Sequence, residues 1–169
     1  SQNTTRLGDR LRPLMARTLY PRADWIVSVS AGVADDLARA GRILRERIRV
    51  IYNSLDLGEI ARKAAEPVEH PWFVPGQPPV ILAVGRMTAQ KDYPVLLQAF
   101  AKLRVRRDAR LLILGEGEER PKLQEQVRRL GLTRDVDMPG FASNPFAYMA
   151  RADLFALSSE WEGFAIVLT

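Results

Sequence analysis

Cysteine is absent from the 169-residue sequence, and histidine occurs once, at His70. The lack of cysteine excludes disulfides, thiolate catalysis and Cys-rich zinc sites, and it fits a reducing compartment. His70 has no second ligand or triad partner at a suitable spacing, so we expect an exposed loop residue there. The sequence therefore predicts no metal site.

Long apolar runs are also missing. No window holds the ~18 uncharged apolar residues that a membrane span needs. The first ten residues, SQNTTRLGDR, are polar and contain no apolar signal-peptide core. We therefore predict a cytoplasmic protein, and peripheral contact with the inner face of the membrane stays open.

Two nucleotide-binding motifs are lacking. The chain has no Gly-x4-Gly-Lys-Ser/Thr phosphate loop, and its one Gly-x-Gly pair, in GEGEER, lacks the third glycine of the dinucleotide fingerprint. The three tryptophans do not have the spacing of a base-stacking platform. These absences argue against a P-loop nucleotidase, a dinucleotide-dependent enzyme and a nucleic-acid partner.

Positive charge is concentrated at the N-terminal end. Residues 1–53 contain ten arginines and five acids, whereas residues 54–169 contain fifteen bases and fifteen acids, so the first third carries the whole net charge of +5. Such an excess is suited to contact with an anionic membrane, a nucleic acid or a phosphorylated substrate. A solvated, arginine-rich helix face is the structural alternative.

The first part of the chain predicts a short α/β segment followed by a connector. Ser30 is placed to cap a helix and Gly41 to end it. The expected elements are a helix over residues 6–20 interrupted at Pro13, a strand over 25–30, a helix over 32–40 and a strand over 47–53. Residues 54–79 hold five prolines and one short expected helix near 57–65, which is typical of a link between domains.

After the connector, apolar strands alternate regularly with amphipathic helices. We predict strands over residues 79–85, 110–117, 136–138 and 152–159, and helices over 94–106, 121–130 and 145–151. This alternation predicts an α/β fold, a Rossmann-like parallel sheet with helices on both faces. Ligands bind at the carboxyl ends of such strands. Function should therefore lie in the loops after Val84, Leu114, Met138 and Leu157.

The first of these loops carries two cations. Gly85 permits a close turn, and Arg86 and Lys91 follow within GRMTAQKDYP. Two fixed cations beside a helix N-terminus suit a diphosphate and would stabilise charge on a departing one. Ordinary surface charge is the alternative interpretation.

The next two loops carry glycines. Gly115 and Gly117 flank Glu116, where they permit either close ligand approach or a tight turn that opens a helix. In PGFASNP, Gly140 precedes Phe141, whose ring could border a flat base. Because of its residue type, we expect Phe141 to pack in the core instead.

The fourth loop is rich in hydroxyl and carboxylate groups. It reads SSEWEG, with Glu160 and Glu162 ahead of Gly163, where a helix is expected to begin. Amides at a helix N-terminus and a nearby carboxylate can bind phosphate or sugar oxygens. A glutamate there also simply complements the helix dipole.

Taken in order, these segments resemble the family 4 retaining glycosyltransferases of the GT-B fold. The resemblance rests on ILAVGRMTAQKDYPVLLQAFAKL, RLLILGEGEERPKLQEQVRRLGL, VDMPGF and ADLFALSSEWEGFAIVL at these spacings. The upstream ADWIVSVSAGVADDL and RIRVIYNSLDL resemble the stretch that closes the first domain of that family. The match covers residues 20–169, most of the chain.

The resemblance implies a two-domain enzyme that uses a nucleotide-diphosphate sugar as donor and needs no cofactor. The catalytic residues implied are Arg86 and Lys91, on the donor diphosphate, and Glu162, on the donor sugar. It implies further donor contacts from Gly85, Gly115, Gly117, Gly140, Phe141, Gly163, Phe164 and Ala165. Ala165 departs from the family's usual glycine, which matters little if its backbone amide is the contact.

The resemblance also divides the chain into parts. Residues 1–53 would end the N-terminal acceptor domain, 54–79 would connect the domains, and 80–169 would be a donor-binding domain truncated at its C-terminus. The second glutamate of the family's Glu-x7-Glu motif would follow Thr169. We therefore expect a middle slice of such an enzyme that is catalytically inactive alone.

The expected activity is sugar transfer to an acceptor hydroxyl with retention of configuration, in glycan, glycolipid or cell-envelope synthesis. The implied partners are a nucleotide sugar and an acceptor glycan or lipid-linked acceptor, with membrane contact through the basic N-terminal segment left open. Two alternatives remain, a nucleotide-binding fragment without turnover and a nucleotide-sugar epimerase on the same fold. No residue matches the acid and base that an epimerase needs.

Overall fold

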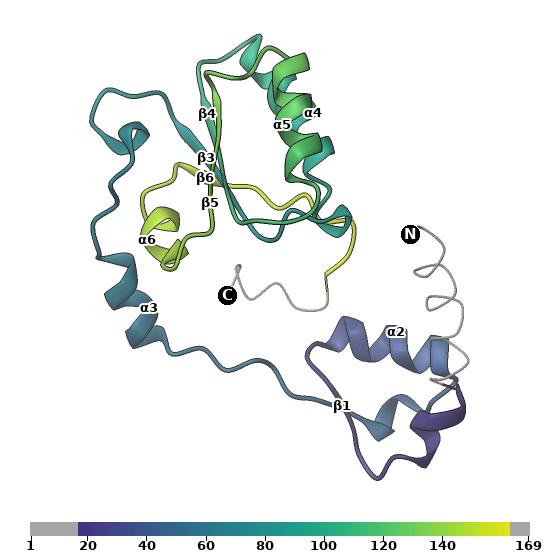
Figure 1. The fold of residues 1–169 in the computed structure, drawn as a ribbon. Coiled ribbons are helices and arrows are strands. Elements are labelled where there is room, and N and C mark those ends of the chain that lie inside the picture. Colours follow the sequence, from purple (N-terminus) through teal and green to yellow (C-terminus); the bar gives the residue numbers. More distant parts are fainter. Residues whose placement is uncertain (1–16, 163–169) are drawn as a thin grey trace. The chain divides into compact units, whose positions relative to one another are not determined.

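A computed structural model of the chain describes residues 17–162 (Figure 1). The helix predicted over residues 6–20 therefore lies mostly outside the described residues. Within the described part, the chain divides after Ser54, and Leu55–Trp161 form a second unit. Each unit is described by itself. None of the helices in residues 17–162 combines the length and apolar character required to cross a bilayer.

The first unit is a small parallel βαβ arrangement. Its elements are η1 (Tyr20–Arg22), β1 (Ile26–Ser28), α2 (Ala31–Gly41), η2 (Arg45–Arg47) and β2 (Ile48–Val50). The two strands pair in parallel, with Ile26 opposite Ile48. Four buried side chains form its core, Ile26, Ala34, Ile43 and Ile48. The predicted strands are thus present but shorter than expected.

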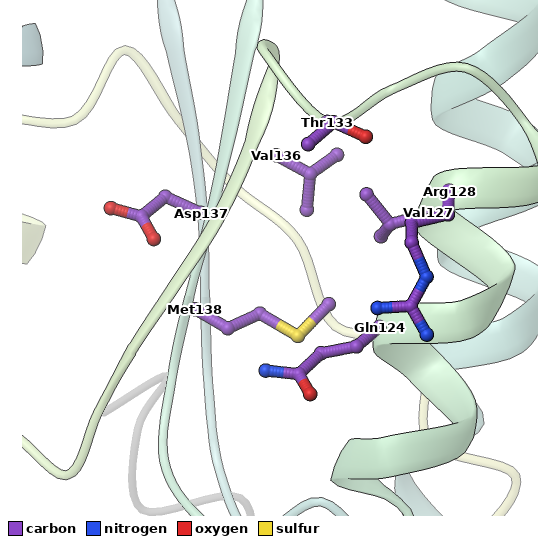
Figure 2. A pocket seen from close by; sticks show the side chains of 7 residues that line it. All are labelled: Gln124, Val127, Arg128, Thr133, Val136, Asp137 and Met138. Carbon is purple, nitrogen blue, oxygen red and sulfur yellow. The ribbon is translucent and has the colours of Figure 1, made fainter.

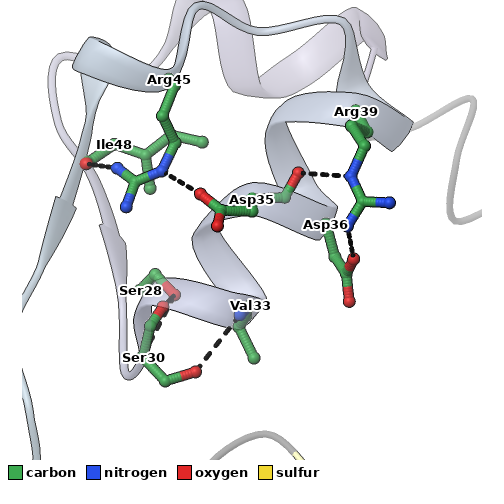
Figure 3. Close-up of polar contacts among 8 residues, drawn as sticks. All are labelled: Ser28, Ser30, Val33, Asp35, Asp36, Arg39, Arg45 and Ile48. Carbon is green, nitrogen blue, oxygen red and sulfur yellow. Dashed lines mark hydrogen bonds and ion pairs between the residues drawn. The ribbon is translucent and has the colours of Figure 1, made fainter.

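Helix α2 begins and ends as predicted, but the left-handed residue at its end is not the glycine. The Ser30 hydroxyl accepts a hydrogen bond from Val33 N at 3.2 Å, which is the expected N-cap (Figure 3). The helix ends at Gly41, as predicted. Gly41 is a buried residue of the last turn, and the left-handed position belongs to Arg42, with φ of 52°.

The arginines of the described part of the first unit make internal contacts. Figure 3 shows Arg45 Nε bonded to Asp35 and Arg39 bonded to Asp36, both at 2.6 Å. Arg47 donates to the carbonyls of residues 21 and 23, and the Arg49 guanidinium lies 4.3 Å from the centre of the Trp25 ring. These contacts give the basic excess a structural role in residues 17–53.

The second unit contains a four-stranded parallel sheet in the order β5-β4-β3-β6. Its elements are α3 (Leu57–Ala64), η3 (Pro71–Phe73), β3 (Val80–Val84), η4 (Ala89–Lys91), α4 (Tyr93–Arg104), β4 (Arg110–Leu114), α5 (Arg120–Arg129), β5 (Val136–Gly140), α6 (Pro145–Met149) and β6 (Leu154–Phe155). This order and the flanking helices confirm the predicted α/β fold with a parallel sheet.

Both faces of this sheet are buried because other elements pack against each of them, and alternate residues of each strand point to opposite sides. One core joins Ala83, Leu111 and Ile113 to α4 and α5. The other joins Val80, Leu82, Leu112 and Leu114 to α6 and the connector. Figure 1 shows α4 and α5 on one side of the sheet and α6 on the other.

Three strands of the second unit differ from the prediction by two or more residues, and one of them, β4, ends at Leu114 rather than at residue 117. β5 continues through Pro139 to Gly140. A proline is tolerated there because β5 is an edge strand, where a residue without a backbone N–H need not break the pairing. β6 is limited to Leu154–Phe155 rather than residues 152–159. After Ala156 N bonds to Leu82 O, the chain leaves the sheet to form a loop.

The segment predicted as a connector packs against the second sheet. The short helix expected near residues 57–65 is present as α3, capped by Asp56, whose carboxylate accepts from Glu59 N at 3.0 Å. Asn144 Nδ2 donates to Lys63 O at 2.9 Å and to Glu66 Oε2 at 2.8 Å. These bonds tie α3 to the start of α6.

The expectation that His70 is an exposed loop residue is wrong. Its side chain is 7% exposed, and its Nε2 lies 3.2 Å from Asp137 Oδ2. Its Nδ1 accepts from Trp72 N at 3.2 Å, so the neutral ring carries its proton on Nε2 and donates it to Asp137. His70 therefore joins the connector to the edge strand β5, a contact invisible to local sequence patterns.

Replacing His70 with alanine is expected to lower the free energy of unfolding by about 2 kcal/mol, because it leaves Trp72 N and Asp137 without their partner. His70→Asn should cost less, since an asparagine oxygen can still accept from Trp72 N. Urea denaturation of both variants measures the difference. Equal stability of His70→Ala and the native protein would contradict this role.

Candidate functional site

A pocket of about 210 Å³ lies where three strands of the second unit end. Its lining comes from the end of β3, the end of β4 and the loop after β5. These residues are Val84, Gly85, Arg86, Leu114, Gly115, Glu116, Phe141, Ala142 and Pro145. Three of the four loops in which function was expected thus meet in one hollow, because parallel strands present their carboxyl ends at the same edge.

The two predicted cations lie close to Gly85. The Arg86 side chain is exposed and lines the pocket. Lys91 is half-buried, and its Cε is 3.0 Å from the position that a Cβ on Gly85 would occupy. The Tyr93 hydroxyl donates to Gly85 O at 3.2 Å on the same side. Arg86 and Lys91 are therefore both beside one short stretch of backbone, the arrangement that suits a diphosphate.

The glycines of GEGEER permit contact between strand ends. A Cβ on Gly115 would lie 2.0 Å from Gly85 O, and one on Gly117 would lie 2.3 Å from Met87 O. Hydrogen bonds fix the same contact, since Gly85 N donates to Leu114 O at 2.9 Å and Met87 N to Glu116 O at 2.8 Å. Close backbone packing thus accounts for both glycines, and their predicted donor contacts stay predictions.

An ion pair that we did not predict borders the pocket. Arg120 Nη1 donates to Glu116 Oε1 at 2.5 Å, and Arg120 Nη2 donates to Met138 O at 2.5 Å. A Cβ on Gly140 would lie 2.7 Å from Glu116 Oε1, so this glycine makes room for the pair. The four-residue spacing of Glu116 and Arg120 was no helical signal for this pair, because α5 begins only at Arg120. Arg120 joins the loop after β4 to β5.

The expectation that Phe141 packs in the core is wrong. Its side chain is 81% exposed, although it lines the strand-end pocket. Phe141 and Ala142 also line a neighbouring pocket of about 390 Å³, together with Glu66, Glu69, Asn144 and Tyr148. The ring follows Gly140, whose φ of 106° turns the chain away from the sheet. An exposed aromatic face at a pocket is suited to stacking on a planar ligand.

The loop after β6 contacts the loop that carries Lys91. Ser158 Oγ donates to Lys91 O at 2.7 Å, and Glu160 N donates to Gln90 O at 2.9 Å. The Ser159 hydroxyl is buried and has no hydrogen-bond partner among the described residues. The fourth loop is therefore joined to the first.

Four predicted site residues are not placed against this pocket. Glu162 is described, but it falls outside the second unit, which ends at Trp161. Gly163, Phe164 and Ala165 lie outside the described residues. Their roles stay predictions.

A different hollow, of about 300 Å³, lies between α5 and β5 (Figure 2). Val136 and Met138 point toward α5 there, while Asp137 points to the opposite side of the strand. The lining contains no residue of the loops after β3, β4 or β6. Because the predicted site residues are elsewhere, we take the strand-end pocket as the candidate site.

Metal ligation finds no support in the part of the chain that the structure describes. Within residues 17–162, no three His, Cys, Asp or Glu side chains lie together as a metal-binding group. The expectation that the protein needs no metal or cofactor stays a prediction.

Several known proteins are similar to the whole chain. The N-acetylgalactosamine-N,N'-diacetylbacillosaminyl-diphospho-undecaprenol 4-alpha-N-acetylgalactosaminyltransferase of Campylobacter jejuni is 37% identical over 89% of the chain. The lipopolysaccharide core biosynthesis glycosyltransferase LpsE of Rhizobium meliloti is 28% identical over 97% of it. The chain spans 39% of the first protein and 45% of the second.

Solved structures agree with these relatives. The Anabaena Alr3699/HepE structure in complex with UDP covers 98% of the chain with a TM-score of 0.74 and 21% identity, and the chain covers 46% of it. The apo lipopolysaccharide outer core galactosyltransferase WaaB covers 86% with a TM-score of 0.64 and 27% identity, and the chain covers 40% of it. These likenesses support the predicted GT-B fold.

Family matches cover both parts of the chain. Residues 2–59 match the family described as Glycosyltransferase Family 4. Residues 68–169, more than half of the chain, match the family described as Glycosyl transferases group 1. The chain therefore belongs to the group 1 glycosyl transferases, as its sequence motifs indicated.

Proposed function

We propose that the protein containing this chain transfers a sugar from a nucleoside-diphosphate sugar to an acceptor hydroxyl, with retention of configuration. The observation that carries the proposal is the strand-end pocket, which Gly85 and Arg86 line, with the side chain of Lys91 packed beside Gly85. Two cations can bind the donor diphosphate and stabilise the charge that develops on it as it leaves. Glu162 would contact the donor sugar.

The proposed donor is consistent with the nature of the pocket. Its lining includes the cationic Arg86 and the exposed ring of Phe141, which suit a phosphate and a flat base, and its one carboxylate, Glu116, is paired with Arg120. One neighbouring structure, Anabaena Alr3699/HepE, has been solved with UDP and with UDP-glucose. Uridine is therefore the first base to test.

The acceptor class is proposed from the relatives. Proteins similar to the chain are named for lipopolysaccharide and undecaprenol-linked glycan synthesis. We propose a glycan or lipid-linked acceptor, with a cytoplasmic protein that contacts the membrane only at its surface. The reaction needs no metal in this proposal, because Arg86 and Lys91 supply the positive charge.

Calorimetry followed by turnover tests the proposal. The intact protein is titrated with uridine, guanosine and adenosine diphosphates. Nucleoside-diphosphate sugars that carry the base that binds are then added together with candidate acceptors. We expect one base to bind and its sugar to be transferred, with the product's anomeric configuration read by NMR. Binding without turnover would favour the nucleotide-binding alternative, and no binding of any diphosphate would contradict the proposal.

A further inference from the structure

Two segments that are far apart in the sequence are joined next to the candidate site. Gln90, in η4, donates through Nε2 to Trp161 O at 2.8 Å across a separation of 71 residues. The backbone oxygen of Gln90 accepts from Glu160 N at 2.9 Å. We call these two hydrogen bonds the Gln90 bridge. The bond from Ser158 Oγ to Lys91 O, at 2.7 Å, lies beside it.

The bridge connects the neighbours of two predicted donor contacts. Gln90 directly precedes Lys91, and Trp161 directly precedes Glu162. Gln90 thus bonds the Lys91 loop to the segment that leads into Glu162. It does so through its side-chain amide and through its backbone carbonyl. A shift of the backbone at Trp161 would be passed to Glu162, the adjacent predicted contact with the sugar.

The segment at residues 160–161 is only weakly held by hydrophobic packing. Trp161 is 58% exposed, and Glu160 is exposed as well. The chain has left β6 after Phe155, so no strand pairing holds residues 158–161. The hydrogen bonds to residues 90 and 91 therefore contribute to their position.

We propose that Gln90 is a positioning residue for the transfer reaction, which fixes the loop leading to Glu162 against the loop that carries Lys91. The inference rests on the proposed function, because it concerns a donor whose diphosphate and sugar are held by different loops. Loss of the bridge should leave the diphosphate contacts in place and misplace the sugar contact. Misplacement of about 1 Å can cost about 100-fold in rate.

Two substitutions at Gln90 isolate the side-chain bond. Gln90→Met keeps the length of the side chain and removes the donor. Gln90→Glu keeps its shape and places a carboxylate against the carbonyl of Trp161, since an ionised carboxylate only accepts. Gln98→Met is the matched control, because Gln98 is exposed on α4.

The expected result is a separation of nucleotide binding from turnover. In the intact protein, both Gln90 variants should bind the nucleoside diphosphate within about 2-fold of native, while kcat for the nucleotide sugar falls about 10- to 100-fold. Hydrogen exchange at Glu160 N should become faster in Gln90→Met, and Gln98→Met should match the native protein throughout.

Native kcat in both Gln90 variants would overturn the inference, as would an equal loss of diphosphate binding and turnover, which indicates a general loss of structure. These outcomes differ from a failure of the proposed function. If the native protein bound no nucleoside diphosphate, the proposed function and the inference would both be wrong.

Discussion

Replacing Lys91 or Arg86 with alanine is expected to weaken binding of the nucleoside diphosphate by about 10- to 100-fold. A hydrogen bond to a charged group contributes about 1.5–3 kcal/mol, and each 1.4 kcal/mol corresponds to a factor of ten in the dissociation constant. Calorimetric titration of the intact protein measures the change. The affinity for the nucleoside diphosphate should also fall as the salt concentration rises, because both contacts are ionic.

Turnover should fall further than binding in these variants. The diphosphate gains negative charge as the bond to the sugar breaks, so the two cations stabilise the transition state more than the bound donor. We expect kcat to fall about 100- to 1000-fold in either variant, on the scale measured for removal of one such stabilising donor. Steady-state kinetics with the nucleotide sugar provide this number.

Lys122→Ala is the matched control for charge. Lys122 lies on α5, and its side chain is 75% exposed and paired with Glu119. Its removal lowers the net charge by the same amount without touching the strand-end pocket, so binding and turnover should remain native. Full activity in both Arg86→Ala and Lys91→Ala would refute the assignment of the diphosphate contacts.

Replacing Gly115 with alanine is expected to destabilise the second unit by about 3 kcal/mol or more. The added Cβ would lie 2.0 Å from Gly85 O, and the φ of 141° at Gly115 disfavours any side chain. Backbone strain of this kind costs about 1–3 kcal/mol, and overpacking adds about 1–3 kcal/mol. The atom in the way belongs to the backbone of a neighbouring strand end, so it cannot rotate aside.

Gly32→Ala is the control for this substitution. Gly32 lies in α2, and nothing lies within 4 Å of the Cβ it would gain. Alanine there should stabilise its helix by about 0.5–1 kcal/mol. Differential scanning calorimetry compares the two variants with the native protein. A native unfolding temperature in Gly115→Ala would show that the ends of β3 and β4 are not held together as described.

The sequence alone determined the order and type of nearly every element of the second unit. Strands such as residues 110–114 are unbroken apolar runs, and helices such as α4 repeat apolar residues at helical spacing. Both signals are local and repeat several times, so they survive without tertiary information. The N-cap at Ser30 was equally local. Parallel order then placed the candidate loops at one edge of the sheet.

Only the tertiary structure decided which side chains are buried and which backbones touch. The side chain of His70 is buried and donates a hydrogen bond to Asp137, 67 residues away, and Phe141 is exposed because Gly140 turns the chain out of the sheet. The contact of Gly115 with Gly85 and the Gln90 bridge likewise join distant residues. Sequence patterns report the periodicity of one segment, whereas these contacts depend on where two segments meet in space.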